Sequence, residues 1–401
     1  LNDEQKNAYD TVINGTNRNY LIHGITGSGK TEVYMRLVEY YLSQGKEAII
    51  LVPEISLTPQ TISRFQSRFG DEIAVLHSKL SISERYDQWS LIKKSKVKIV
   101  VGARSAIFAP FDNIGIIVVD EEHEASYKSE KNPKYDAIDI AMKRAELSGA
   151  KLVLGTATPS IERMYRVYKK EIELIRLNKR ATNSKLPEVD VVDMTEELKN
   201  ENFSMFSNLL KEEIEKALAQ KHQVILFLNK RGHTSFVFCR SCGYVYRCEA
   251  CDVAMTYHKY NDRLVCHFCG RTAKRKGTCE NCGSTYIKEF GAGTEKLEEE
   301  TKLFFPNARV YRMDADTVTT RADYEKVYSM MINKQIDILI GTQMLAKGLD
   351  FPNVTVVGVM AADISLNLPD YKASEKTYQL ITQVSGRAGR GDYEGRVIVQ
   401  T

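Results

Sequence analysis

Cysteine is absent from most of this sequence and concentrated where it occurs. The chain has 401 residues and eight cysteines, all of them between Cys239 and Cys282. A secreted protein stabilised by disulfides distributes its cysteines so that they join distant segments. The clustering therefore argues against a disulfide framework, favours metal ligation and indicates a cytoplasmic protein.

Long apolar runs and a strong excess of one charge are also missing. No hydrophobic stretch approaches the ~20 residues that cross a bilayer, and the polar start LNDEQKNAYD lacks the layout of a signal peptide. The net charge of +4 is too small to indicate nucleic acid by itself, so a DNA surface must come from local arrangement. The start without Met and the strand-like end GRVIVQT predict a piece of a longer protein.

Strand-like and helix-like stretches alternate along most of the chain. Nearly continuous Val/Ile-rich runs are typical of parallel strands buried on both faces. Amphipathic stretches such as TEVYMRLVEYYLSQG (31–45) separate them. Predicted strands lie at 19–24, 47–53, 73–78, 97–102, 115–120 and 151–156, and a second series follows a predicted helix at 204–220, with strands at 223–229, 308–314, 337–342, 354–360 and 396–400. This is the pattern of an α/β protein with two doubly wound parallel-sheet lobes.

These patterns divide the chain into four predicted parts. Residues 1–180 form a first lobe, and the polar stretch 181–203 is interpreted as an irregular connector. Residues 204–238 and 283–401 form a second lobe, which the cysteine-rich stretch 239–282 interrupts. This insertion has too few apolar residues to fold alone, so bound metal is expected to stabilise it.

A phosphate-binding loop is predicted near the N-terminus. The stretch GITGSGKT fits the pattern G-x-x-x-x-G-K-[ST] and lies between a predicted strand and a predicted helix. Its glycines let backbone N–H groups surround phosphates, Lys30 reaches the β- and γ-phosphates, and Thr31 holds Mg²⁺. The predicted ATP-binding residues of this loop are Gly24, Ile25, Thr26, Gly27, Ser28, Gly29, Lys30 and Thr31.

Two further motifs supply acids and arginines. In IIVVDEEHE, Asp120 ends a predicted buried strand and is interpreted as the Mg²⁺-binding acid, and Glu121 as the residue that orients or deprotonates the attacking water. In QVSGRAGRG, Arg387 and Arg390 are predicted to stabilise the γ-phosphate in the transition state from the second lobe. The predicted catalytic residues are thus Lys30, Asp120, Glu121, Arg387 and Arg390.

The cysteines form four C-x-x-C pairs, a spacing that presents two thiolates to one tetrahedral ion. Nested pairing fits the spacing, because the middle two pairs are separated as in a zinc ribbon and the outer pairs can then close around a second ion. Sequential pairing remains open. In the nested arrangement one zinc is held by Cys239, Cys242, Cys279 and Cys282, and the other by Cys248, Cys251, Cys266 and Cys269.

Together these motifs resemble those of superfamily 2 helicases. The order is GITGSGKT, DEEH, GTATPS (155–160), IGTQMLAKGLDFP (340–352) and QVSGRAGR. With VPEISLTPQ (52–60), GARSAIFAPF (102–111), FLNKRGH (227–233) and the C-x-x-C pairs added, the chain resembles the PriA family of bacterial replication-restart helicases over essentially its whole length.

This resemblance implies two RecA-like lobes, nested zinc pairing and further residue roles. Gln5 would recognise adenine, and Thr156 and Thr158 would couple the ATP state to lobe closure. Thr342 and Asp350 would line the cleft from the second lobe. The stretch ASYKSEKNPKY after DEEH would sense single-stranded DNA, with Tyr127, Lys128 and Tyr135 stacking on bases or contacting phosphate.

The resulting functional hypothesis is an ATP-dependent DNA helicase core. The resemblance implies 3′→5′ unwinding at stalled or repaired forks and help in assembling the primosome. ATP, Mg²⁺ and two Zn²⁺ are the implied cofactors. The implied partners are single-stranded and forked DNA, other primosome proteins and single-strand-binding proteins, with no membrane. Two alternatives stay open: a DNA translocase or remodeller that moves without separating strands, and a zinc-bearing assembly scaffold switched by ATP.

Overall fold

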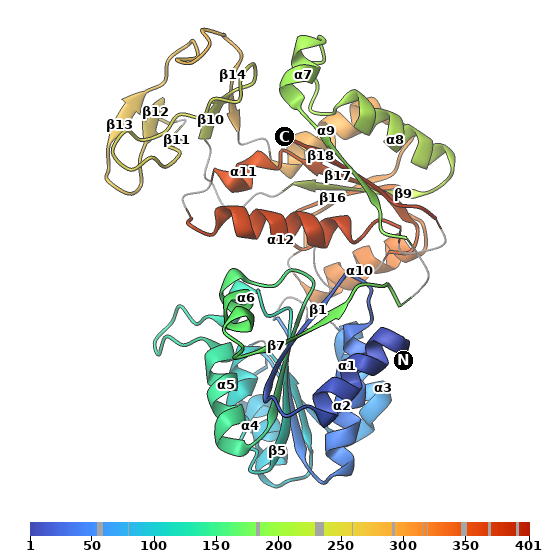
Figure 1. Cartoon of the computed structure of the whole chain (residues 1–401). Helices are drawn as coiled ribbons and strands as arrows, with labels where there is room; N and C mark the ends of the chain where they lie inside the picture. The colour runs from blue at the N-terminus through green and yellow to red at the C-terminus, as the bar shows by residue number, and fades with distance from the viewer. Residues whose placement is uncertain are drawn as a thin grey trace. The chain divides into compact units, whose positions relative to one another are not determined.

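The computed structural model of the chain forms two compact units, Leu1–Asn183 and Ser184–Thr401 (Figure 1). It describes residues 1–401 except 54–58, 79, 182–184, 229–235, 259, 291–292, 315, 319, 346–350, 368–369 and 390–392. None of the helices it describes is both long enough and apolar enough to cross a bilayer.

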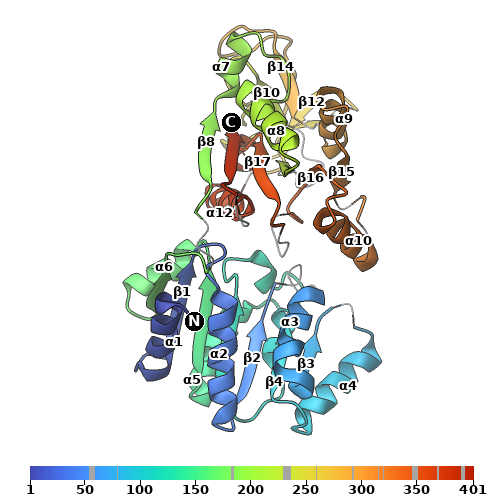
Figure 2. The ribbon, with the colours of Figure 1, turned by 90° about the vertical axis from the view of Figure 1, so that its right-hand side faces the viewer.

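The first unit is built on a parallel sheet with the strand order β3-β4-β2-β5-β6-β1-β7. Its strands are β1 (Asn19–Gly24), β2 (Glu47–Leu51), β3 (Ile73–Leu76), β4 (Ile99–Gly102), β5 (Ile114–Asp120), β6 (Lys151–Thr156) and β7 (Glu173–Leu177). Its helices are α1 (Asp3–Asn14), α2 (Lys30–Ser43), α3 (Pro59–Phe69), α4 (Ile82–Lys93), α5 (Ala137–Ser148) and α6 (Ile161–Tyr168). Helices α1, α2 and α3 cover one face of this sheet (Figure 2), and α4 and α5 cover the other (Figure 1).

Alternating side chains of the strands explain the two layers of helices. Along β2, Ile49 packs with residues of α4 and α5, whereas its neighbour Ile50 packs with residues of α1, α2 and α3. Successive side chains of a strand point to opposite faces, so a run that is apolar at every position needs a cover on both sides.

The second unit repeats this plan with the strand order β15-β16-β9-β17-β18-β8. Its strands are β8 (Glu188–Val192), β9 (Gln223–Leu228), β15 (Val310–Met313), β16 (Ile338–Gly341), β17 (Val354–Met360) and β18 (Arg396–Gln400). Its helices are α7 (Met194–Lys199), α8 (Asn208–Ala219), α9 (Thr294–Phe304), α10 (Arg321–Ile332), α11 (Asp363–Leu366) and α12 (Ala373–Ser385). All described strand pairs of this sheet are parallel, and α8 and α9 pack on one face while α10 and α12 pack on the other. The chain is therefore an α/β protein with two RecA-like parallel-sheet lobes, as the sequence predicts.

A separate antiparallel sheet forms within the second unit, in the order β13-β12-β11-β10-β14. Its strands are β10 (Phe236–Cys239), β11 (Thr256–His258), β12 (Arg263–Val265), β13 (Thr272–Lys274) and β14 (Ile287–Phe290). Four cysteines contribute to its small core. The predicted insertion 239–282 thus lies within a small sheet that begins at Phe236 and ends at Phe290, with a core of its own.

The predicted connector 181–203 differs from an irregular segment. Within it, β8 extends the second sheet by pairing with β18, and α7 follows. The sequence hides β8 because it is an edge strand: polar residues alternate with Val189 and Val191, which are both exposed. Strand β7 has no clear sequence signal for the same reason, because ELIRL has a mixed composition and lies at an edge of the first sheet.

Candidate nucleotide site and cysteine clusters

Three motifs of the first unit meet at the carboxyl edge of its sheet. The loop Gly24–Thr31 follows β1, Asp120 ends β5, and GTATPS begins within β6, which lies between the other two strands. Because the strands are parallel, their carboxyl ends face the same way. Residues more than a hundred positions apart in sequence thereby line one site.

The backbone of the predicted phosphate loop is preformed. Gly27 and Gly29 have φ of 82° and 79°, a left-handed conformation that a side chain would strain. A Cβ atom on Gly29 would also come within 2.3 Å of the Gln5 amide nitrogen. Helix α2 begins at Lys30 with no side chain capping its first turn, so its N–H groups remain suited to an anion. The Lys30 Nζ donates to the Gly24 carbonyl at 2.8 Å, across the mouth of the loop.

Gln5 is buried against this loop. Its Nε2 donates to the Ser28 carbonyl at 2.9 Å, and its Oε1 accepts from the Asn2 backbone N–H at 2.9 Å. Both ends of the amide are therefore hydrogen-bonded within the protein. The predicted contact with adenine stays a prediction.

Asp120 and Glu121 form a partly buried acidic pair. Burial and the neighbouring Glu121 raise the pKa of Asp120 to about 7, while Lys30 lowers it. Glu121 adopts a φ of 47°, an uncommon conformation for a residue with a side chain and one that functional sites often contain. Its Oε2 atom is buried and makes no hydrogen bond within the described residues; the His123 Nδ1 lies 3.6 Å away. Buried carboxylates with unused acceptor capacity are the donor set that Mg²⁺ and a water molecule require.

The next two residues of the acid motif bind the GTATPS segment. The Glu122 carboxylate accepts hydrogen bonds from the backbone and hydroxyl of Ser160, at 2.7 and 3.0 Å. His123 Nδ1 lies 2.7 Å from the Thr156 hydroxyl, which also accepts from the Thr158 backbone N–H at 3.0 Å. The predicted coupling threonines are therefore joined directly to the acid motif.

Two tyrosines that sequence reasoning did not assign to this site support Asp120. Tyr34, fully buried one helical turn after Lys30, donates to Asp120 Oδ1 at 3.3 Å. Tyr127 is 1% exposed and donates to the Asp120 carbonyl at 2.6 Å. The expectation that Tyr127 stacks on DNA is therefore wrong, because its ring lies in the core of the first unit. No sequence signal distinguishes such a tyrosine from an exposed one in a polar loop.

The other two residues expected to contact DNA remain accessible. Lys128 is exposed, and its Nζ lies 3.9 Å from the Asp136 carboxylate. Tyr135 is half-buried and packs edge-on against the exposed Phe108 ring, with centroids 5.2 Å apart.

The predicted residues of the second lobe are only partly described. Arg387 follows α12 and is buried, and Thr342 follows β16, where its carbonyl accepts from the Leu345 N–H at 2.9 Å. Arg390 and Asp350 lie outside the described residues.

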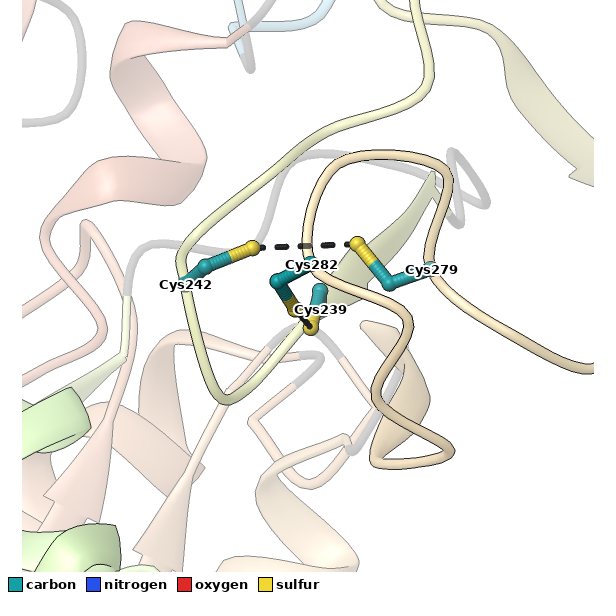
Figure 3. A group of neighbouring side chains, drawn as sticks. All are labelled: Cys239, Cys242, Cys279 and Cys282. Atoms are coloured by element: carbon teal, nitrogen blue, oxygen red, sulfur yellow. Dashed lines mark hydrogen bonds between the residues drawn. The ribbon is translucent and has the colours of Figure 1, made fainter.

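The eight cysteines gather into two groups of four. One group contains Cys239, Cys242, Cys279 and Cys282 (Figure 3), and the other contains Cys248, Cys251, Cys266 and Cys269. All sulfurs of a group lie within 4.8 Å of one another. This is the nested arrangement. Sulfur–sulfur distances of 3.6 Å for Cys239–Cys282 and 3.7 Å for Cys242–Cys279 are too long for disulfides. They fit a tetrahedral ion with metal–sulfur bonds of ~2.3 Å, which separates its ligands by roughly 3.8 Å.

Each pair adopts the same tight turn. The backbone N–H that follows the second cysteine donates to the carbonyl of the first, at 2.8–2.9 Å in all four turns. The donors are Gly243, Asp252, Gly270 and Gly283, all with positive φ. Glycine after three of the four pairs is therefore a sequence signal for these turns.

One of these turns also fastens the insertion to the second lobe. Arg240, between Cys239 and Cys242, is 9% exposed. Its guanidinium donates to the carbonyls of Phe203, at 2.7 Å, and of Asn202 and Ser204. The turn of the Cys239 cluster is therefore linked directly to the segment between α7 and α8.

Comparison with known proteins identifies the class first. Two family models match the lobes: DEAD/DEAH box helicase over residues 2–167 and helicase conserved C-terminal domain over residues 279–392. The structure of the DUF1998 helicase MrfA bound to DNA aligns with a TM-score of 0.60 and 15% identity, covering 100% of this chain and 46% of that one. The fold is that of a superfamily 2 helicase core.

The particular family follows from the insertion and from whole-chain similarity. Residues 248–274 match the model for the PriA DNA helicase Cys-rich region domain. The replication restart protein PriA of Bacillus subtilis (strain 168) is 53% identical over 100% of this chain, and that of Synechocystis is 44% identical over 100% of it. The chain belongs to the PriA family. It spans about half the length of these curated relatives, 50% of each.

Proposed function

We propose that this chain is the ATP-driven motor of a replication-restart DNA helicase. The observation that carries the proposal is the meeting of Lys30, Asp120 and Glu121 at one sheet edge, in a chain 53% identical to a replication restart protein. We assign ATP binding to residues 1–180 and propose 3′→5′ unwinding, a direction taken from the family.

The residues of the first unit would divide the hydrolysis of ATP among them. The loop N–H groups and Lys30 would bind the phosphates, and Thr31 and Asp120 would hold Mg²⁺. Bound Mg²⁺ neutralises charge on the phosphate oxygens. Glu121 would orient the attacking water and accept its proton. Gln5 at adenine, and Arg387 with Arg390 in the transition state, stay predictions.

The two cysteine clusters would each hold one Zn²⁺. Four thiolates in a closed tetrahedral set are typical of structural zinc, which supplies folding free energy to small domains. The residues of the insertion then serve as a rigid element carried by the second lobe. Single-stranded and forked DNA, other primosome proteins and single-strand-binding proteins are the proposed partners, in the cytoplasm.

A strand-displacement assay with parallel ATP measurements tests this proposal. The chain should separate a forked duplex only with ATP, and Lys30→Ala should lose ATP turnover and unwinding while keeping its zinc and fold. Turnover of the variant near the unmodified level would overturn the phosphate-loop assignment. Hydrolysis stimulated by DNA without strand separation would favour a translocase, and ATP binding that only changes shape would favour a scaffold.

A further inference from the structure

Helix α6 presents an aromatic face that the core of the first unit does not use. Its inner residues Met164 and Val167 pack against that core. On its outer face, Ile161, Tyr165 and Tyr168 are 68%, 58% and 79% exposed. Large apolar side chains gathered on one exposed face usually mark an interaction site, since burying them would stabilise the fold.

The two rings are arranged as a platform. Tyr165 and Tyr168 have centroids 6.4 Å apart and planes inclined by 28°, and the Lys169 Nζ lies 5.4 Å from the centroid of the Tyr165 ring. Aromatic faces beside a cation bind single-stranded nucleic acid without regard to sequence, because every base has a π-face and every nucleotide a phosphate.

Basic and acidic side chains both surround this platform. The basic residues Arg166, Lys169 and Lys170 lie on or just after the helix, beside the exposed acids Glu162 and Glu171. Asp139 on the neighbouring α5 is paired with two arginines, Arg163 and Arg166, both at 3.3 Å. Arg166 is thus engaged with an acid, whereas Lys169, beside the Tyr165 ring, is a cation placed to contact a phosphate.

Ion pairs place α6 beside a second basic segment. Arg163 lies 3.7 Å from Asp136, at the end of the loop 128–135, which exposes Lys128, Lys131 and Lys134. Figure 1 shows α6 and α5 on the same side of the first unit. The inner side of α6 thus contacts the end of this loop, which exposes further lysines near the helix.

We propose that the outer face of α6 is a stacking platform for single-stranded DNA, with Tyr165 and Tyr168 binding bases and Lys169 a phosphate. This inference rests on the proposed function and adds a binding site to it. The helix is also joined to the ATP site, since its N-cap Ser160 donates to Glu122. DNA bound on this face would therefore contact a helix whose N-cap residue is hydrogen-bonded to the acid motif.

The test compares ring removal with ring retention in the full 401-residue chain. Tyr165→Ala with Tyr168→Ala should weaken binding of a labelled dT20 oligonucleotide at least tenfold, because stacking contributes ~1–3 kcal/mol per base and the pair removes two stacking rings. The DNA concentration that half-stimulates ATP turnover should rise by the same factor, and turnover without DNA should not change. Tyr165→Phe with Tyr168→Phe should bind as the unmodified chain does, because stacking needs only the ring.

The chain provides a matched control on another helix. Tyr86 and Trp89 on α4 form a similar exposed stacked pair, with centroids 6.5 Å apart and planes inclined by 22°. Their replacement by Ala should change dT20 affinity less than twofold.

Each contrary result has a distinct meaning. An α6 alanine pair that binds dT20 normally, or loses no more than the α4 pair, overturns the inference and leaves α6 as a protein-binding face. A phenylalanine pair as weak as the alanine pair overturns stacking. If the unmodified chain neither binds dT20 nor hydrolyses ATP, the proposed function fails and this inference fails with it.

Discussion

At the residue scale, Glu121 shows best how the site is prepared for chemistry. Its left-handed backbone and its buried Oε2 atom, which accepts no hydrogen bond from the residues that the structure describes, both cost folding free energy. Such a cost is typical of a residue kept for function. Glu121→Gln should therefore bind ATP as before and lower single-turnover hydrolysis at least a hundredfold, because the amide keeps the shape but cannot accept a proton. Nucleotide binding and single-turnover rates would be measured beside Glu130→Gln, an exposed control. Loss of ATP binding would show instead that Glu121 has a structural role.

Gly155 is required by a neighbour rather than by its own backbone. A Cβ atom there would lie 1.5 Å from the Tyr34 hydroxyl, which donates to Asp120. Gly155→Ala should lower the free energy of unfolding by roughly 1–3 kcal/mol, as overpacking does, and slow ATP turnover by displacing Tyr34.

Urea unfolding measures this effect. Tyr34→Phe in the same background should recover part of the loss, because it removes the nearest atom but leaves a ring carbon 2.6 Å away. Gly277→Ala, where the Cβ would meet nothing within 4 Å, should be nearly neutral. Equal stability of Gly155→Ala and Gly277→Ala would contradict the clash.

Residues with a spacing signature could be assigned from sequence, and residues defined by packing could not. Lys30 and Asp120 belong to patterns that fix both residue type and position. Tyr34 and Tyr127 act through contacts across 86 and 7 positions, and such contacts depend on how strands and helices assemble. Sequence patterns therefore do not indicate Tyr34, and they predict an exposed Tyr127 ring where the structure has a buried one.

At the element scale, burial decided which strands could be recognised. Central strands such as β5 and β17 are apolar at nearly every position because both faces are covered. Edge strands β7 and β8 have exposed positions and polar residues, so their sequences resemble loops. Pairing with a neighbour, and not composition, makes them strands.

The turn containing Arg240 contributes two cysteines to a cluster and also links the insertion to the second lobe. The two roles can be tested separately. Arg240→Ala should keep all eight cysteines in place and the metal content unchanged. It removes charged hydrogen bonds to three buried or half-buried carbonyl groups, which should cost about 2–3 kcal/mol in local stability. Chymotrypsin should then cleave faster at the exposed Phe203, and unwinding should fall several-fold while ATP turnover persists.

Arg247→Ala is the matched control for this turn. Arg247 also joins the insertion to the lobe, but through one side-chain bond to Asn367 at 3.1 Å and from a half-exposed position. Cleavage and unwinding should change little. If Arg240→Ala behaves as Arg247→Ala does, the insertion is not held to the lobe through Arg240.

At the scale of the whole molecule, the nested clusters predict how metal loss spreads. Cys239 and Cys282 are 43 positions apart yet their sulfurs are 3.6 Å apart, so they serve one ion and Cys248 serves the other. Cys239→Ser and Cys239→Ser with Cys282→Ser should each release about one zinc per chain, whereas Cys239→Ser with Cys248→Ser should release both. Metal counting by atomic absorption on purified protein distinguishes this from sequential pairing, in which Cys282 would serve a different ion from Cys239.

The two ions should also differ in their effect on the motor. The first would be held by the turn that carries Arg240, so its loss, as in Cys239→Ser, should uncouple the insertion from the second lobe and reduce unwinding. The second would be held by Cys266 and its partners, none of which belongs to that turn, so Cys266→Ser should leave the link to the lobe intact. ATP turnover should survive in both Cys239→Ser and Cys266→Ser, because neither substitution changes Lys30, Asp120 or Glu121. Normal unwinding by a chain that has lost both ions would contradict a role for the insertion in strand separation.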